Sequence, residues 1–265
     1  PNGWSGPCFK TVERSILNPL SDAGKVTEKM SELGLAHRIP KTYASVQDAF
    51  NDQSKADDLW FIRSQFRGAN DKTLCLPTPI MAAATVPSGH VLQKAVDGLA
   101  LIDQHKFTAR FYVVAVRGQL MCYEDSVVFV HGAAYAPNDA NHASQVDNRS
   151  YRDAGSHIKL VPGSQTPHAA TLAEASKALT ADMTCLLDEV RQASVAGDTE
   201  GQAFAILALD TLLTKSGDLK LLRIHTFPNF ITTAQIDADV HVPLFEDVLR
   251  VMAGMPSRKL ATITD

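Results

Sequence analysis

Apolar residues recur at helical spacing near the start of the chain. Ser21-Asp22 is a capping pair, Val26, Met30 and Leu33 follow at intervals of about one helical turn, and Gly34 stands at the stop position. This pattern predicts a helix that begins after Asp22 and ends before Gly34.

Three further segments carry the signals of a helix start. Residues 45–48 resemble a capping box, residues 171–174 form one before a long apolar stripe, and Pro243 opens the last helical pattern. We expect the second of these helices to end at Gly197 and the third to end at Gly254. The residues expected to be buried on these two helices are Leu172, Ala175, Leu179, Met183, Leu186, Val190, Leu244, Val248 and Val251.

Strand patterns, rich in β-branched and aromatic residues, fill the regions between these helices. Arg117-Gly118 and Ser216-Gly217-Asp218 are turn signals that indicate two hairpins, and Glu124-Asp125 interrupts the first of them. The expected strands are residues 59–63, 107–116, 119–123, 126–130, 203–213 and 219–226.

The order of these elements predicts the fold class. Antiparallel strands are grouped between helices and do not alternate with them as βαβ units, so we expect an α+β protein. We expect a small lobe at residues 1–96 and a larger lobe at residues 97–265, with residues 138–164 as a polar loop over the larger sheet.

Composition excludes several classes of protein. The chain has 265 residues, of which 45% are hydrophobic and 20% charged, so we expect a globular protein. A net charge of −4 without a basic stripe argues against nucleic acid as a partner. No apolar run reaches the roughly 18–20 residues of a membrane span, and no signal peptide opens the chain. The start lacks an initiator Met, which suits a processed or partial product.

The four cysteines give no metal-binding or redox motif. Cys8, Cys75, Cys122 and Cys185 are far apart in sequence, which favours reduced thiols in an intracellular, cytoplasmic protein, although the sequence leaves disulfide pairing open. Motifs of serine hydrolases, zinc proteases, P-loop enzymes and dinucleotide-binding proteins do not occur in the sequence.

Several segments together resemble one family. Residues 91–96 contain a Gln-Lys pair, residues 101–102 are apolar, and residues 106–113 read Lys-Phe-x-x-Arg-x-Tyr-Val. Residues 207–213 and 221–228 resemble a closing hairpin. In this order, over residues 20–255, they are similar to the tubulin–tyrosine ligase family of ATP-grasp proteins. The resemblance implies two lobes, with antiparallel sheets and flanking helices, around a nucleotide cleft.

The resemblance also implies which residues bind ATP. Gln93 and Lys94 correspond to the adenine edge, and Arg63 stands where a lysine of the small lobe reaches the α and β phosphates. Arg110 corresponds to the family's strand arginine, which serves the phosphates or the acyl phosphate, and Lys106 corresponds to the neighbour of that arginine, which we expect to bind the cofactor. The alternative for these last two is a solvated or salt-bridged face of a half-buried strand. His142-Ala143-Ser144-Gln145 is similar to a segment near the acceptor site.

Two features differ from the family pattern. The glycine-rich loop of the small lobe keeps only Gly68, within residues 66–72. Of the three magnesium ligands only Asp210 remains, because Arg223 replaces a Glu and His225 replaces an Asn. If the hairpin folds about Ser216-Gly217, Asp210 faces Arg223 on the same side as His225.

The sequence therefore supports alternative functions. The first hypothesis is that an Asp210–Arg223 ion pair replaces metal bridging in a catalytically impaired protein, kept as a pseudoenzyme or assembly subunit that binds a protein or peptide partner. A salt bridge of purely structural use is the alternative to that hypothesis. The second hypothesis is an active carboxylate–amine ligase, with Arg110 and Asp210 in catalytic roles and Asp210 binding one magnesium ion. An unrelated α+β protein is the third.

Overall fold

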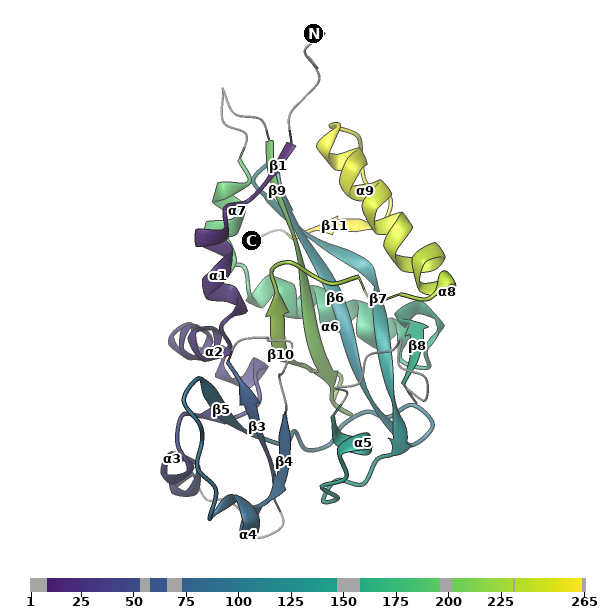
Figure 1. Ribbon diagram of the computed structural model, residues 1–265. Helices are drawn as coiled ribbons and strands as arrows, with labels where there is room; N and C mark the ends of the chain where they lie inside the picture. Colours follow the sequence, from purple (N-terminus) through teal and green to yellow (C-terminus); the bar gives the residue numbers. More distant parts are fainter. Residues whose placement is uncertain are drawn as a thin grey trace, which may run out of the picture.

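The computed structural model describes residues 9–52, 58–65, 73–146, 158–195, 202–230 and 232–263. They form a mixed α and β structure with two separate sheets, as Figure 1 shows. The predicted α+β class is confirmed. None of the helices within these ranges combines the length and the apolar character needed to cross a bilayer.

The large sheet has seven strands and is mostly antiparallel. Its central order is β1-β9-β6-β7-β11, with β10 on β9 and β8 on β7, and only β1 runs parallel to its neighbour. The strands are β1 (Phe9–Thr11), β6 (His105–Val116), β7 (Gln119–Ala134), β8 (Lys159–Pro162), β9 (Gln202–Leu213), β10 (Leu219–His225) and β11 (Leu260–Thr262).

The two predicted hairpins form this sheet. Arg117 and Gly118 have φ angles of 53° and 74°, so the predicted turn between β6 and β7 is confirmed. The predicted break at Glu124-Asp125 is instead a bulge in one continuous strand, because the register shifts there.

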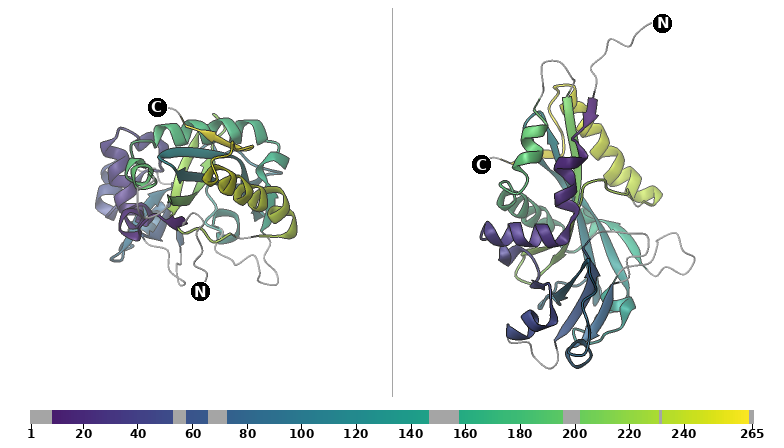
Figure 2. Two further views of the ribbon diagram at one scale, coloured as in Figure 1. Left: turned by 90° about the horizontal axis from the view of Figure 1, so that it is seen from above. Right: turned by 60° about the vertical axis from the view of Figure 1, so that its left-hand side comes forward.

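Helices cover both faces of the large sheet, as the view from above in Figure 2 shows. One face packs against α1 (Arg14–Ser21), α2 (Ala23–Glu32), α6 (Ala169–Asp182) and α7 (Asp188–Ala193). The other packs against α8 (Ala234–Ile236), the π-helical segment η3 (Asp237–His241) and α9 (Val242–Met252). Short helical segments are η1 (Ala36–Arg38), η2 (Gly163–Gln165) and α5 (His142–Gln145).

The small sheet has four antiparallel strands in the order β2-β5-β3-β4. They are β2 (Thr42–Tyr43), β3 (Leu59–Ser64), β4 (Leu74–Pro77) and β5 (His90–Lys94), with α3 (Val46–Asn51) and α4 (Thr78–Met81). Trp60, Ile62 and Leu92 pack on one face of the sheet with Ala49 of α3 and Met81 of α4. Phe61 alternates to the opposite face, which is turned toward Lys106 of the large sheet.

The packing differs from the predicted division at residue 96. β5 ends just before that position, but residues 9–39 lie against the large sheet rather than within a small lobe. Leu17, Leu20 and Met30 of α1 and α2 are buried in the same core as β6 and β9. By packing, the small lobe therefore comprises the described residues between 42 and 94.

The predicted helices are mostly present. Asp22 caps α2 by accepting from the backbone N–H groups of Gly24 and Lys25, as expected. The helix predicted after residue 171 begins earlier, at Ala169, without a side-chain cap, and divides into α6 and α7. Met183, Leu187 and Val190 are all buried across the division, so the predicted apolar stripe persists with Leu187 in place of Leu186.

Candidate functional site

The most distinctive polar group on the large sheet is a buried ion pair between neighbouring strands. Arg110 of β6 and Asp210 of β9 are directly opposite in register. Arg110 Nε donates to Asp210 Oδ1 at 2.7 Å, and Nη2 donates to Oδ2 at 2.9 Å. The side chains keep 5% and 19% of their surface exposed. This two-point geometry is the strong form of an arginine–carboxylate pair.

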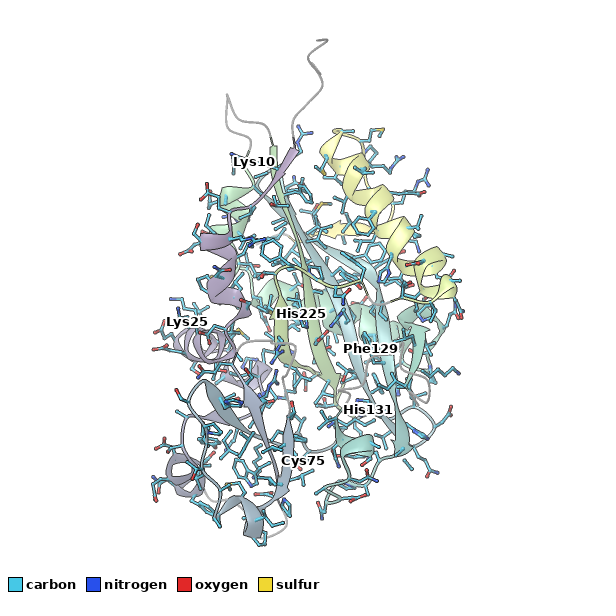
Figure 3. The ribbon with its side chains drawn as sticks, in the orientation of Figure 1. Lys10, Lys25, Cys75, Phe129, His131 and His225 are labelled. Carbon is cyan, nitrogen blue, oxygen red and sulfur yellow. The ribbon has the colours of Figure 1, made fainter. Side chains whose placement is uncertain are left out.

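Three further groups complete the cluster. His225 Nε2 of β10 lies 2.6 Å from Asp210 Oδ2 and 3.3 Å from Arg110 Nη2. Arg110 Nη1 donates to the backbone carbonyl of Asn229 at 3.2 Å, and the guanidinium lies 5.2 Å from the Phe129 ring centroid. Figure 3 labels His225 and Phe129 on this face of the sheet. We call Arg110, Asp210 and His225 the ion cluster.

The ion cluster keeps Asp210 ionised. Burial alone would raise the pKa of its carboxyl, but the charge of Arg110 and the hydrogen bonds from Arg110 and His225 outweigh burial. The pKa of Asp210 is therefore well below its usual range. Its negative charge is compensated by side chains of the protein itself.

Arg223 takes the predicted backbone position but not the predicted partner. It is paired with Asp210 in register, after a bulge that begins at Leu221. Within the described part of the chain, however, Asp210 forms an ion pair with Arg110 and a hydrogen bond with His225, and it does not pair with Arg223. Arg223 Nη2 donates to the Ser64 carbonyl at 3.2 Å, at the end of β3. The predicted Asp210–Arg223 pair is wrong, because Arg110 approaches Asp210 from the other neighbouring strand.

The ion cluster does not fit a magnesium ion. Magnesium takes oxygen ligands in octahedral geometry, and a guanidinium cannot ligate a cation. Both Asp210 oxygens already accept hydrogen bonds, and Arg110 lies where an ion would approach. Over the described ranges, no group of three or more His, Cys, Asp or Glu side chains is arranged to hold a metal ion.

On the small sheet, Arg63 and Gln93 are in direct contact. Arg63 Nη1 donates to Gln93 Oε1 at 2.9 Å, and Gln93 Nε2 donates to Thr42 Oγ1 at 3.1 Å. Gln93 is opposite Phe61 in register, so both side chains point to the face that is turned toward the large sheet. These contacts fix the amide and hold the guanidinium at the junction of the two sheets.

Lys94 lies on the opposite face of the small sheet from Gln93. It is paired with Trp60 in register, and its Nζ contacts Asp58 Oδ2 at 2.7 Å. Its backbone N–H donates to the Lys41 carbonyl at 2.9 Å. The prediction that Lys94 shares one cleft with Arg110 and Asp210 is therefore wrong, because adjacent residues of a strand point to opposite faces.

Lys106 joins the two sheets. Its side chain is almost fully buried, and Nζ donates to the Gln145 carbonyl at 2.9 Å. The ammonium lies 5.1 Å from the ring centroid of Phe61, on the small sheet, and 6.0 Å from that of Tyr135. No carboxylate of the described residues lies within ion-pair distance of it. Burial lowers the pKa of Lys106 to about 8.

Cys75 is a free thiol on the face of β4 that is turned toward Lys106. Figure 3 labels it on the small sheet. Burial raises the pKa of the Cys75 thiol to about 11, although Lys106 acts in the opposite direction. The thiol therefore stays protonated at neutral pH and adds no negative charge beside Lys106.

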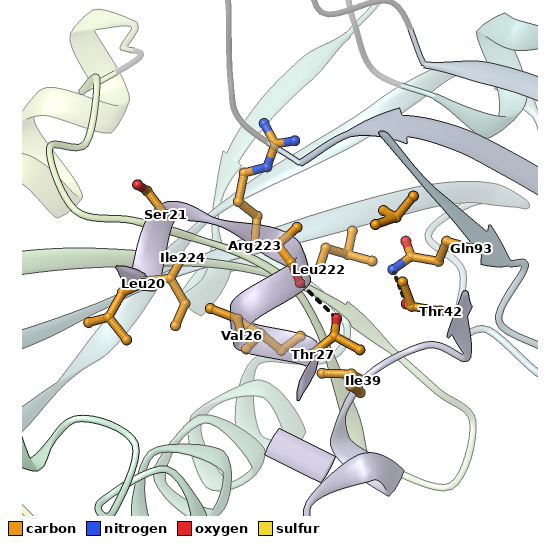
Figure 4. Close-up of a pocket in the computed structure, with 13 residues that line it drawn as sticks. Leu20, Ser21, Val26, Thr27, Ile39, Thr42, Gln93, Leu222, Arg223 and Ile224 are labelled. Carbon is orange, nitrogen blue, oxygen red and sulfur yellow. Dashed lines mark hydrogen bonds between the residues drawn. The ribbon is translucent and has the colours of Figure 1, made fainter. Parts of the chain in front are cut away.

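A pocket lies where the small sheet meets α2 and β10, as Figure 4 shows. Its empty space of about 380 Å³ includes open solvent, so the pocket is a shallow recess and not a closed cavity. Gln93 and Thr42 form its polar side, and the Arg223 guanidinium points away from its apolar side. The residues that line it are Leu20, Ser21, Ala23, Val26, Thr27, Ile39, Thr42, Val91, Gln93, Leu221, Leu222, Arg223 and Ile224.

Some contacts of the site have no signal in the sequence. Asn229 acts through its backbone carbonyl, which any residue could supply. Gln145 was expected near an acceptor, whereas its carbonyl instead accepts from Lys106. Residues 66–72, the segment with the single remaining glycine, lie outside the described residues.

A second hydrogen-bonded chain lies next to the ion cluster. Tyr112, two residues after Arg110 on β6, contacts His241 Nε2 through its hydroxyl at 2.9 Å. His241 Nδ1 lies 3.1 Å from Asp237 Oδ1. Phe230 stacks on the Tyr112 ring at a centroid distance of 5.7 Å and meets the His241 ring edge-on at 5.2 Å.

Comparisons with known proteins add no assignment, since no family model matches the sequence and no curated protein matches it either.

Proposed function

We propose that the chain is a divergent ATP-grasp-like protein, similar to the tubulin–tyrosine ligase family, that binds nucleotide through its own cations and is catalytically impaired. The observation that carries this proposal is the two-point Arg110–Asp210 pair with His225 at hydrogen-bond distance. The Arg110 guanidinium neutralises the Asp210 carboxylate, and Asp210 stands at the position where the resemblance expects a metal ligand.

The arrangement of cations supports phosphate as the ligand. Arg63, Lys106 and Arg223 lie at the junction of the two sheets, in contact with Gln93, Gln145 and Ser64 respectively. Arginine binds phosphate oxygens in a two-point geometry and stays charged at all physiological pH values. With Asp210 already neutralised, this junction favours an anion and has no need of a bridging metal.

The same features argue against ligase activity. Formation of an acyl phosphate from ATP normally relies on divalent metal to neutralise charge on the transferred phosphoryl group. Loss of that metal removes several kcal/mol of transition-state stabilisation. We therefore propose a pseudoenzyme or assembly subunit, in which nucleotide binding serves the association with a protein or peptide partner.

Substitution of cations on the two faces of the small sheet tests where nucleotide binds. In EDTA, we expect Arg63→Met to weaken ATP binding about tenfold or more, because one charge-assisted hydrogen bond is lost. Lys94→Met is the matched control, since Lys94 lies on the opposite face. It should leave the affinity for ATP unchanged. Both affinities are measured from ATP-dependent shifts in Tm, each against the same variant without ATP.

Two results would contradict the proposal. The wild-type protein could show no ATP-dependent shift in Tm, or Lys94→Met could weaken binding as much as Arg63→Met does. Amide formation or ATP hydrolysis that depends on magnesium and is lost in Asp210→Asn would establish the active ligase instead.

A further inference from the structure

Helix α9 has apolar residues on two opposite sides. Leu244, Val248 and Val251 are buried against the large sheet, as predicted. On the other side Val242, Phe245 and Leu249 keep 50%, 40% and 62% of their surface exposed. The exposed C-cap residue Ala253 continues this line. We call Val242, Phe245, Leu249 and Ala253 the outer seam.

The spacing of the outer seam is that of a helix-packing surface. Its members follow one another at three, four and four residues, so they lie along one side of the helix. A helix at the surface of a monomer normally carries polar residues there, and a continuous exposed apolar patch indicates an interaction site. Phe230 extends the patch, since its ring lies 4.8 Å from that of Phe245. Figure 1 shows α9 along the outside of the molecule.

The outer seam is close to self-complementary. A twofold axis between Phe245 and Leu249, perpendicular to the helix, exchanges these two positions. The same axis places Val242 of one copy opposite Ala253 of the other, with an offset along the helix of about one residue, or ~1.5 Å. Large side chains then meet at the centre and small ones meet at the ends, which is the pattern that an antiparallel pair of identical helices requires.

The charges beside the seam fit the same arrangement. Glu246 is exposed and Arg250, one turn later, is partly exposed, and both flank the seam. Arg250 Nε donates to the Pro256 carbonyl at 3.0 Å, which holds the guanidinium at the C-terminal end of the helix. In an antiparallel pair, each Glu246 lies beside Arg250 of the other copy. The ion pair therefore forms twice, once on each side of the axis.

We propose that the outer seam binds the outer seam of a second copy of this chain, with the two α9 helices antiparallel in a twofold dimer. The contact surface is short, because α9 has 11 residues. We expect the small interface of a weak, reversible dimer, with Kd on the order of micromolar. This inference is independent of the proposed nucleotide function.

Charge exchange between two variants tests the pairing directly. Glu246→Arg places two cations beside the seam, and Arg250→Glu places two anions there. Each variant alone should weaken dimerisation about tenfold or more, because like charges then face each other twice. An equimolar mixture of the two variants should recover the wild-type affinity as heterodimers. An ion pair within one helix could not produce that recovery.

The measurement is sedimentation equilibrium over a wide range of protein concentrations, with thermal melts to show that each variant is folded. Leu249→Lys should abolish dimerisation. Ile80→Lys is the matched control, since Ile80 is also exposed, at 58%, but lies in α4 on the small lobe. A wild-type protein that is monomeric at every concentration would overturn the proposal. So would a dimer that Leu249→Lys leaves intact, or folded variants that remain monomeric when mixed.

Discussion

Replacement of Arg110 by methionine is expected to lower the free energy of unfolding by about 3 kcal/mol. The substitution leaves Asp210 largely buried without the guanidinium that pairs with it, and with His225 as its remaining side-chain hydrogen-bond partner among the described residues. A buried carboxylate that loses its cation retains the cost of leaving water, and the ion pair no longer compensates for that cost. Urea denaturation at neutral pH measures the loss.

The double variant Arg110→Met/Asp210→Met is the control for this prediction. Removal of both charges leaves no unpaired buried charge at this position, so the double variant should lose much less stability than Arg110→Met alone. If the single variant is as stable as the wild type, or if the double variant is less stable than the single one, the pair does not neutralise Asp210 as we describe.

The pH dependence of stability provides a further test of the Arg110–Asp210 pair. The pKa of Asp210 is depressed in the folded protein, so its contribution to stability is present above the unfolded pKa of about 4. The contribution is lost as pH falls below that value toward the folded pKa. The double variant has no Asp210 to protonate, so its free energy of unfolding should fall less as the pH is lowered through this range.

Replacement of Lys106 by methionine is expected to raise the free energy of unfolding at pH 7. Burial lowers the pKa of Lys106 from 10.5 to about 8, which corresponds to a penalty of about 3 kcal/mol for the charged form. Loss of the Gln145 hydrogen bond and of the contact with the Phe61 ring offsets part of the gain. The net stabilisation should be about 1–2 kcal/mol.

The size of the stabilisation by Lys106→Met depends on pH. Below pH 8 the lysine is protonated in both folded and unfolded states, so the full penalty applies. Between pH 8 and about 10.5 the unfolded chain binds more protons than the folded one, so the wild type gains stability as pH rises. The advantage of Lys106→Met should therefore shrink over this interval. Equal stability of the two proteins at pH 7, or an advantage that grows above pH 8, would contradict the account.

Lys94→Met provides the comparison for Lys106. The Lys94 ammonium is paired with Asp58 at 2.7 Å, so its removal leaves a carboxylate without that partner and should not stabilise the protein. A buried lysine that lowers stability is typical of a residue that is retained because it binds a ligand. In the proposed nucleotide cleft, that ligand is the anionic phosphate of ATP. We accordingly expect Lys106→Met to bind ATP more weakly while it unfolds at a higher temperature.

Local patterns in the sequence predicted most of the regular elements. Asp22, the Arg117-Gly118 turn and the strands 203–213 and 219–226 are specified by neighbours in sequence, and all are present. Helix α1 was not predicted. It has no side-chain cap and contains Pro19, so its stability depends on burial of Leu17 and Leu20 against the large sheet. That contact involves partners distant in sequence.

In the candidate site too, contacts between residues distant in sequence could not be predicted from local patterns. The register of Asp210 with Arg223 follows from the hairpin alone and was predicted correctly. The true partner, Arg110, lies 100 residues away, and only the order of strands in the sheet places it beside Asp210. The resemblance of the Gln93-Lys94 pair to the family's adenine edge predicts both residues in the cleft, although strand alternation points their side chains to opposite faces.

The most direct test of the central claim is calorimetric titration of ATP into the wild-type protein, once in EDTA and once in excess magnesium. Because Arg110 neutralises Asp210, and Arg63, Lys106 and Arg223 supply the cations, we predict that ATP binds in EDTA at least as tightly as in magnesium. Binding that occurs only with magnesium, and that Asp210→Asn abolishes, would contradict the account.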